Sequence, residues 1–132
     1  MNRLLFNDFL ASNDTLRVYS GDELLFTSAK DSLLPLLDYI AEFAPRSAGI
    51  TVFDRIVGNA AALLLVKADC RKVYGPLGSE LAARTLDSHA VEYHFTEVVP
   101  YILNRSGQGM CPMEKLSLHK TPEEFYDTVA NL

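Results

Sequence analysis

The segment between residues 54 and 67 places the strongest constraint on the fold. Read as a helix, it presents apolar side chains in nearly every direction: Ile56, Val57, Ala60, Ala61, Leu64 and Val66. A helix of this kind must be buried on most of its sides. Gly58 and the alanines at 60–62 keep it thin, so a sheet or another helix can come close. We expect Asp54 to cap this helix and the helix to run to about Lys67. Its first turn, with Asp54, Arg55 and Asn59, is the part polar enough to face a cavity.

The residues before this helix predict a helix, a hairpin and a second helix. Apolar residues between 4 and 10 are spaced as in an amphipathic helix, and Gly21-Asp22 separates two short apolar runs, 16–20 and 23–28. A glycine in such a two-residue connection supplies the positive φ that tight hairpins need. Ser32 is expected to cap the next helix, with Pro35 in its first turn. The apolar face of that helix is Leu33, Leu36, Leu37, Ile40 and Ala44.

The residues after the central helix alternate between strand and helix patterns. Residues 50–53, just before that helix, are typical of a strand or a loop that leads into it. Residues 70–77 are typical of a strand, and Ser79 is expected to cap a helix. Residues 91–96 alternate between apolar and polar side chains, the period-two pattern of a half-buried strand. Thr121 to Glu124 has the form of a capping box with Pro122 at the first helical position. We therefore predict an α/β fold, a mixed β-sheet covered by helices, with residues 1–132 as one domain.

Composition and charge exclude several classes of function. The chain has 17 Asp and Glu against 12 Lys and Arg, a formal net charge of -5, which repels nucleic acid and anionic membranes. Asp8 interrupts the N-terminal stretch where a secretory signal needs apolar residues, and two cysteines do not form a disulfide framework. We expect a cytoplasmic protein that binds neither nucleic acid nor membrane. A homodimer through the strand at 91–98 is a further expectation, because Tyr74 and Tyr93 are of a type enriched at interfaces.

Residues 103–111 form the stretch that local propensity explains least. Pro112 suits the first position of a helix, which makes Cys111 its N-cap, and a thiol there feels the positive end of the helix dipole. Gly107 and Gly109 allow the backbone N–H groups of the loop to converge in an anion nest or oxyanion hole. Arg105 adds a guanidinium suited to phosphate or carboxylate.

Each of these residues also has an ordinary structural interpretation. Cys111 is equally read as a buried apolar side chain, and Glu114 as a cap that reaches back to the Cys111 N–H. Asp54 and Ser79 are explained as N-caps, and Arg105 as a member of a surface ion pair. With those alternatives open, the candidate catalytic residue is Cys111. The candidate ligand-binding residues are Asp54, Asn59, Ser79, Asn104, Arg105, Gly107, Gly109 and Glu114.

Several blocks of the sequence resemble a known family. These blocks are residues 54–61 (DRIVGNAA), 79–82 (SELA), 100–105 (PYILNR) and 111–115 (CPMEK). They resemble the small prokaryotic family of domains of unknown function called DUF1893. The resemblance implies a variant of the cytidine-deaminase-like fold, with a three-layer architecture, and implies no established activity.

The resemblance also allows one chemistry to be excluded. Zinc deaminases place His or Cys ligands at the starts of two consecutive helices. The matching positions here, residues 53–55 and 76–80, contain neither His nor Cys, and Cys111 alone cannot complete a zinc site. We therefore expect no zinc-dependent deaminase, no metal and no cofactor.

Three classes of function remain open. The first is a domain that binds a small polar, anionic or nucleotide-like ligand in a degenerate, zinc-free pocket of the deaminase type. The second is an enzyme that uses Cys111 as a nucleophile or redox thiol, although no histidine lies near that cysteine in sequence. The third is a structural or partner-binding domain. The sequence does not decide whether the protein is an enzyme.

Overall fold

The structure is a computed structural model that describes residues 2–43 and 48–131. In chain order its elements are α1 (Asn2–Ala11), β1 (Leu16–Ser20), β2 (Glu23–Ser28), α2 (Leu34–Phe43), β3 (Ile50–Asp54), β4 (Ile56–Val57), α3 (Asn59–Lys67), β5 (Cys70–Ser79), α4 (Glu80–Ser88), β6 (Glu92–Val99), α5 (Pro112–Ser117) and α6 (Pro122–Ala130).

The six strands form one mixed sheet. β1 pairs antiparallel with both β2 and β3, whereas β3, β4 and β6 each pair in parallel with β5. β4 and β6 use the same residues of β5, Leu77 and Gly78, and therefore lie on opposite edges of that strand. The predicted mixed sheet covered by helices is thus confirmed.

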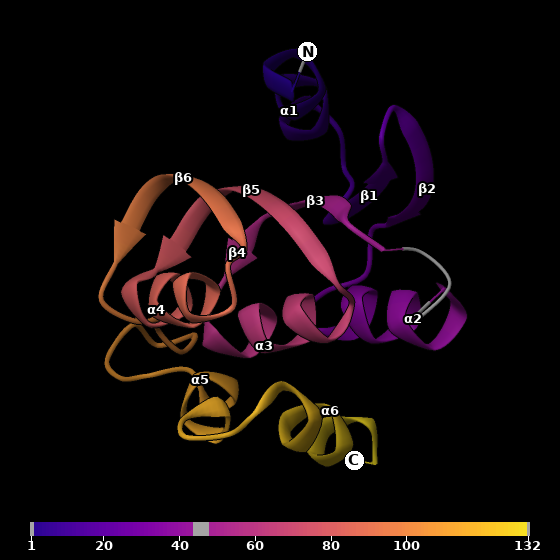
Figure 1. Ribbon diagram of the computed structural model, residues 1–132. Coiled ribbons are helices and arrows are strands. Elements are labelled where there is room, and N and C mark those ends of the chain that lie inside the picture. Colours follow the sequence, from indigo (N-terminus) through magenta and orange to yellow (C-terminus); the bar gives the residue numbers. More distant parts are fainter. Residues whose placement is uncertain (1, 44–47, 132) are drawn as a thin grey trace.

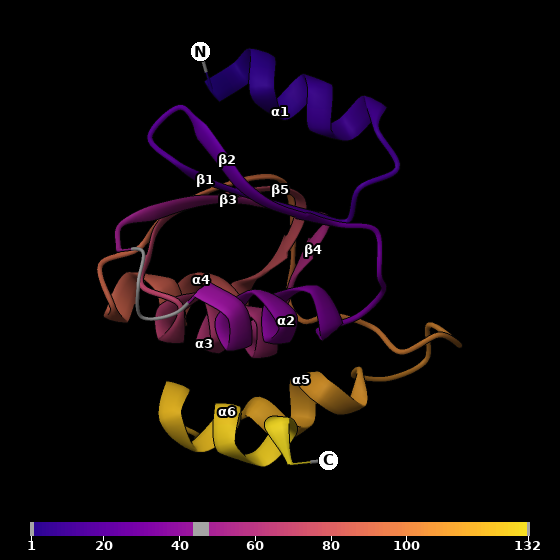
Figure 2. The same cartoon turned by 90° about the vertical axis from the view of Figure 1, so that its right-hand side faces the viewer.

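Helices cover the two faces of the sheet unequally. α1 lies alone against one face, and α2, α3 and α4 lie side by side against the other (Figures 1 and 2). α5 and α6 form a further layer beneath α3, which the three-layer expectation does not include (Figure 2). α3 is consequently enclosed by the sheet, by its two neighbours and by the last two helices, and Ala62, Leu64 and Leu65 are fully buried. This explains why its sequence is apolar on nearly every side.

Two clusters of buried side chains occupy the two faces. The larger one lies between the sheet and the helices on the α3 side. The smaller one, under α1, contains Phe9, Tyr19 and Phe53, with Phe6 and Tyr74 packed against it. Its aromatic rings approach one another with centroids between 5.4 and 6.1 Å apart, within the range of favourable aromatic pairs.

Arg55, which follows β3, connects the sheet to the C-terminal end of α1 through hydrogen bonds. Its guanidinium donates to the backbone carbonyl oxygens of Phe9 (2.9 Å), Leu10 (3.4 Å), Ser12 (2.8 Å) and Asp14 (3.0 Å). It also lies over the Phe9 ring, 4.5 Å from the centroid. A cation at the C-terminal end of a helix satisfies carbonyl groups that have no partner within the helix.

Several local predictions are confirmed. The hairpin turns at Gly21-Asp22, where Gly21 has a φ of 58°. Ser79 caps α4 and accepts a hydrogen bond from the Ala82 N–H, and Thr121 caps α6 in a complete capping box. β5 extends two residues beyond the predicted 70–77, up to the Ser79 cap itself.

Two predicted helix starts are wrong. Asp54 does not cap α3, because Ile56 and Val57 pair with β5 and delay the helix until Asn59, with Gly58 as its N-cap. Ser32 has a φ of 62° and α2 begins only at Leu34, so the expected cap is not formed. Ala44, expected at the end of the α2 face, lies outside the described residues.

Candidate functional site

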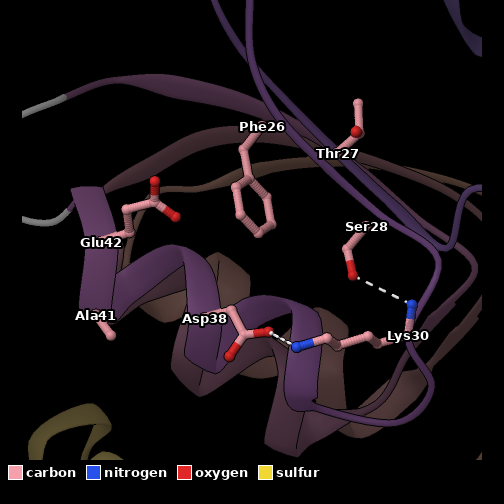
Figure 3. Close-up of a pocket in the computed structure, with 7 residues that line it drawn as sticks. All are labelled: Phe26, Thr27, Ser28, Lys30, Asp38, Ala41 and Glu42. Atoms are coloured by element: carbon pink, nitrogen blue, oxygen red, sulfur yellow. Dashed lines mark hydrogen bonds and ion pairs between the residues drawn. The ribbon is translucent and has the colours of Figure 1, made fainter.

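Two hollows on the surface come into consideration. One lies between β2 and α2 and has a volume of about 520 Å³ (Figure 3). Lys30 is one of its lining residues and donates from its side chain to Asp38 (2.8 Å) and from its backbone N–H to the Ser28 hydroxyl (3.2 Å). This hollow contains none of the candidate residues from the sequence.

The other hollow, which we call the α3 pocket, has a volume of about 460 Å³. Its walls come from Thr15 and from residues within 31–33, 54–61 and 102–114. It lies at the carboxyl ends of β3 and β4, the place where open α/β sheets characteristically bind ligands. Of the candidate residues, Asp54, Arg105, Cys111 and Glu114 line it, although they are distant in sequence. We therefore take it as the candidate site.

Glu114 lines the inner wall of the α3 pocket and is only 2% exposed. Its Oε1 accepts the backbone N–H of Asn59, the first residue of α3, at 2.5 Å, and its Oε2 accepts that of Ile102 at 2.9 Å. A carboxylate in this position satisfies an otherwise unpaired donor and complements the positive end of the α3 dipole. Glu114 therefore caps α3 from another helix.

This geometry corrects the expected role of Glu114. The Cys111 N–H donates to the Ile102 carbonyl oxygen at 2.8 Å, so Glu114 does not reach back to it. The carboxylate instead turns toward Gly58, where a Cβ atom would lie 2.8 Å from its Oε1. A glycine at position 58 leaves the space that the cap requires.

Asn59 and Ser79 do not line the pocket. The Asn59 side chain is buried and donates to the Ser117 hydroxyl (3.0 Å), while its Oδ1 accepts a hydrogen bond from Thr85. Ser117 in turn donates to the Glu114 carbonyl oxygen (2.6 Å). These contacts tie α3, α4 and α5 together. Ser79 is fully buried as the cap of α4.

Asp54 is the titrating group of the pocket. Burial raises the pKa of its carboxyl from 3.8 to about 7, although hydrogen bonds from the backbone N–H groups of Arg55 and Ile56 oppose this rise. Near neutral pH the group is therefore present in both protonation states. It can donate as a carboxylic acid or accept as a carboxylate.

Residues 103–110 form a small hairpin on the outer side of the pocket. Leu103 and Met110 form an isolated antiparallel bridge, and the Asn104 N–H donates to the Gly109 carbonyl at 2.8 Å. The Gly107 N–H donates back to the Asn104 carbonyl at 3.0 Å, and Gly107 has a φ of 74°. Asn104, Gly107 and Gly109 therefore shape the hairpin. The N–H groups of Gly107 and Cys111 already donate to carbonyl oxygens of the chain, so they are not available to the anion nest that the sequence predicts. Figure 2 shows this segment, in orange, projecting beyond α5.

Cys111 is half-buried at the start of α5, and its thiol makes no capping hydrogen bond. His89, His94 and His119 are exposed and none lines the pocket. Within residues 2–43 and 48–131, no group of three His, Cys, Asp or Glu side chains is arranged to hold a metal ion. Across the same residues, no helix combines the length and apolar character that crossing a membrane requires.

Sequence reasoning missed several lining residues. Asp31 and Ser32, just before α2, and Leu103, on the hairpin, reach the pocket only through the tertiary fold. Thr85 and Ser117, which hold Asn59, have ordinary local patterns and gave no signal. Ser32 has a positive φ, which its residue type does not predict, because glycine is the residue that commonly adopts this conformation.

Comparisons with known proteins agree with the fold. A family model described as "Domain of unknown function (DUF1893)" matches residues 6–132. The crystal structure of a DUF1893 family protein from Thermotoga maritima is similar with a TM-score of 0.88 and 29% sequence identity, covering 98% of this chain and 88% of that one. None of the curated proteins matches the sequence.

Proposed function

We propose that this chain, which belongs to the DUF1893 family of domains of unknown function, binds a small polar, nucleotide-like ligand in the α3 pocket. The observation that carries this proposal is the gathering of Asp54, Arg105 and Cys111 around one hollow of about 460 Å³. That volume is in the ordinary range for small-molecule sites. The position at the carboxyl ends of parallel strands adds support.

We also propose that this pocket is a degenerate, zinc-free version of a deaminase-type pocket. The proposal rests on the resemblance and on the helix starts at Gly58-Asn59 and Ser79-Glu80, which supply neither His nor Cys. At these helix starts, the Asn59 side chain bonds to Ser117 of α5, and the Ser79 hydroxyl caps α4. Both side chains therefore have structural partners.

The two cysteines provide a direct test of ligand binding. Cys111 lines the pocket and is half-buried, whereas Cys70 is buried elsewhere and burial raises the pKa of its thiol well above the ordinary value. Iodoacetamide should therefore modify Cys111 selectively. A panel of nucleosides, nucleotides and sugar phosphates is added, and the rate of Cys111 modification and the melting temperature are measured. A binding compound slows the modification and raises the melting temperature. If no compound does either, the proposal is wrong.

A Cys111-dependent enzyme remains the alternative proposal from the sequence. No histidine lines the pocket within the described residues, so a base for such an enzyme would have to come from a lining carboxylate such as Asp54 or from the substrate. We favour the ligand-binding role because binding a ligand in the pocket requires no catalytic base.

The expected homodimer is also kept as a proposal. β6 pairs with β5, and Val98 near its end is 52% exposed. Edge strands offer unpaired backbone groups to a second chain. Light scattering that gives the monomer mass at high concentration would contradict it.

A further inference from the structure

We propose that the ligand of the α3 pocket is a planar molecule with an acidic group, and that Arg105 binds the acidic group while Asp54 faces an N–H or O–H donor at the other end. This inference rests on the proposed function. It adds the chemical class of the ligand and the role of each residue. Its basis is a comparison of which polar groups of the pocket are already bonded and which are free.

Of the two guanidinium groups that line the pocket, only Arg105 is free to bind a ligand. Arg55 directs its donors to carbonyl oxygens at the end of α1 and in the following loop, including those of Phe9 and Ser12. Arg105 is exposed on the hairpin and has no hydrogen bond or ion pair with the described residues. Its planar fork suits a phosphate or a carboxylate.

Among the lining carboxylates, Glu114 is fully engaged, whereas Asp54 and the exposed Asp31 are not. Both Glu114 oxygens accept backbone N–H groups, those of Asn59 and Ile102. Asp54 also accepts two backbone N–H groups, but a carboxylate offers about four acceptor sites. As a whole residue, Asp54 is half-buried and lines the pocket. Asp54 therefore retains capacity for a donor on the ligand.

Part of the pocket lining is apolar. Ile56 lies two residues from Asp54 and Leu103 two residues from Arg105, and their side chains are 51% and 52% exposed. Large aliphatic side chains left this open on the walls of one hollow offer apolar surface to a flat ligand. Each polar group, Asp54 and Arg105, therefore has a large apolar side chain close to it in sequence on the lining.

The charge of the protein makes Arg105 decisive. The pocket is lined by two arginines, and one of them, Arg55, is already engaged. The other ionisable lining groups are the Cys111 thiol and three acidic side chains, Asp31, Asp54 and Glu114. The whole chain carries a net charge of -5. This field repels an acidic ligand, and the Arg105 guanidinium offsets that repulsion at the pocket.

The test is isothermal titration calorimetry of the full chain with three probes: adenosine 5′-monophosphate, adenosine and inorganic phosphate. The wild type is compared with Arg105→Ala, Arg105→Lys, Asp54→Ala and Asp54→Asn. We expect Arg105→Ala to weaken binding of the monophosphate about tenfold or more and to leave adenosine unchanged. Arg105→Lys is expected to recover part of the loss. Asp54→Ala should weaken both nucleoside probes, and Asp54→Asn keeps the test valid if the alanine variant does not fold.

The outcomes separate this inference from the proposed function. If the monophosphate and adenosine bind the wild type equally and Arg105→Ala changes neither, the inference is wrong and the proposed function stands. Binding of inorganic phosphate as tightly as the monophosphate would mean an anion site without the planar part, which also overturns the inference. If no probe binds the wild type, both the inference and the nucleotide-like form of the proposed function fail.

Discussion

Two parts of the α3 pocket hold their charged residues in opposite ways: the inner wall, formed at Glu114, and the hairpin of residues 103–110. On the inner wall Glu114 is 2% exposed and both of its oxygens accept backbone N–H groups. On the hairpin, Arg105 is exposed and has no partner among the described residues, and the hydrogen bonds of residues 103–110 join members of the hairpin to one another.

The contrast indicates a division between stability and binding. A buried carboxylate is stable only when its oxygens accept hydrogen bonds. Removing such a carboxylate leaves its donors without partners, which lowers the stability of the fold. An exposed guanidinium contributes little to folding and remains available to a ligand. We therefore expect variants of the inner wall to change stability and variants of the hairpin to change affinity.

The largest expected effect is that of Glu114. Glu114→Ala leaves the N–H groups of Asn59 and Ile102 without an acceptor and should lower the free energy of unfolding by about 3 kcal/mol. Glu114→Gln retains one acceptor and should lose about 2 kcal/mol. Urea denaturation measures both. Lys115→Ala, at the exposed neighbouring position, is the control and should change stability by less than about 0.5 kcal/mol.

Asp54 lines the same pocket and is expected to affect both binding and stability. Its effect on the free energy of unfolding should have the opposite sign to that of Glu114, because the Asp54 carboxylate destabilises the folded protein at neutral and alkaline pH. Folding raises its pKa from 3.8 to about 7, so between these values the folded protein holds a proton that the unfolded chain has released. Its contribution to stability is therefore fully present below about pH 4 and is lost as the pH rises to about 7.

Asp54→Asn removes this loss. The variant should be more stable than the wild type at about pH 8, by an amount on the order of 2 kcal/mol, and the advantage should vanish near pH 4. Denaturation curves across this range, with Asp127→Asn on the exposed face of α6 as the control, measure the difference. A variant less stable than the wild type at alkaline pH would show that Asp54 is not destabilised by burial.

On the hairpin, Gly107 should have a smaller effect. Its φ of 74° is strained for any residue with a Cβ atom, although no atom stands within 4 Å of that position. Gly107→Ala should therefore cost about 1 kcal/mol, from the backbone alone. Gln108→Ala, its exposed neighbour, should cost less than about 0.5 kcal/mol. Equal stabilities of the two variants, by thermal denaturation, would mean that the hairpin rearranges freely.

The elements that the sequence predicts well are those determined by local chemistry. Gly21-Asp22, Ser79 and Thr121 each act within a few residues of their own position, and the structure confirms all three roles. The enclosure of α3 was also predicted, because its apolar side chains leave no direction for solvent.

The errors arise where distant segments compete for the same residues. Ile56 and Val57 fit a helix by sequence, but their pairing with Leu77 and Gly78 of β5 makes them a strand. Glu114 has the position in sequence that a capping box requires, but its carboxylate instead accepts the buried N–H of Asn59 at the start of α3 and the partly buried N–H of Ile102. Neither competitor is visible in the local pattern.

The candidate site divides along the same line. The sequence selected Asp54, Arg105, Cys111 and Glu114 for their chemistry, and the fold brings them to one pocket. It also selected Asn59 and Ser79, which the fold buries in structural roles. Whether a polar side chain faces a cavity or a neighbouring helix depends on packing of α3, α4 and α5 that no single segment encodes.

The most direct test of the division between the two walls compares Arg105→Ala with Glu114→Gln in the same pair of measurements. Each variant is unfolded in urea and titrated with adenosine 5′-monophosphate. We predict that Arg105→Ala keeps the wild-type unfolding free energy within about 0.5 kcal/mol and weakens binding about tenfold, whereas Glu114→Gln loses about 2 kcal/mol of stability. An Arg105→Ala variant that is destabilised by that amount, yet binds the monophosphate as the wild type does, would contradict the account.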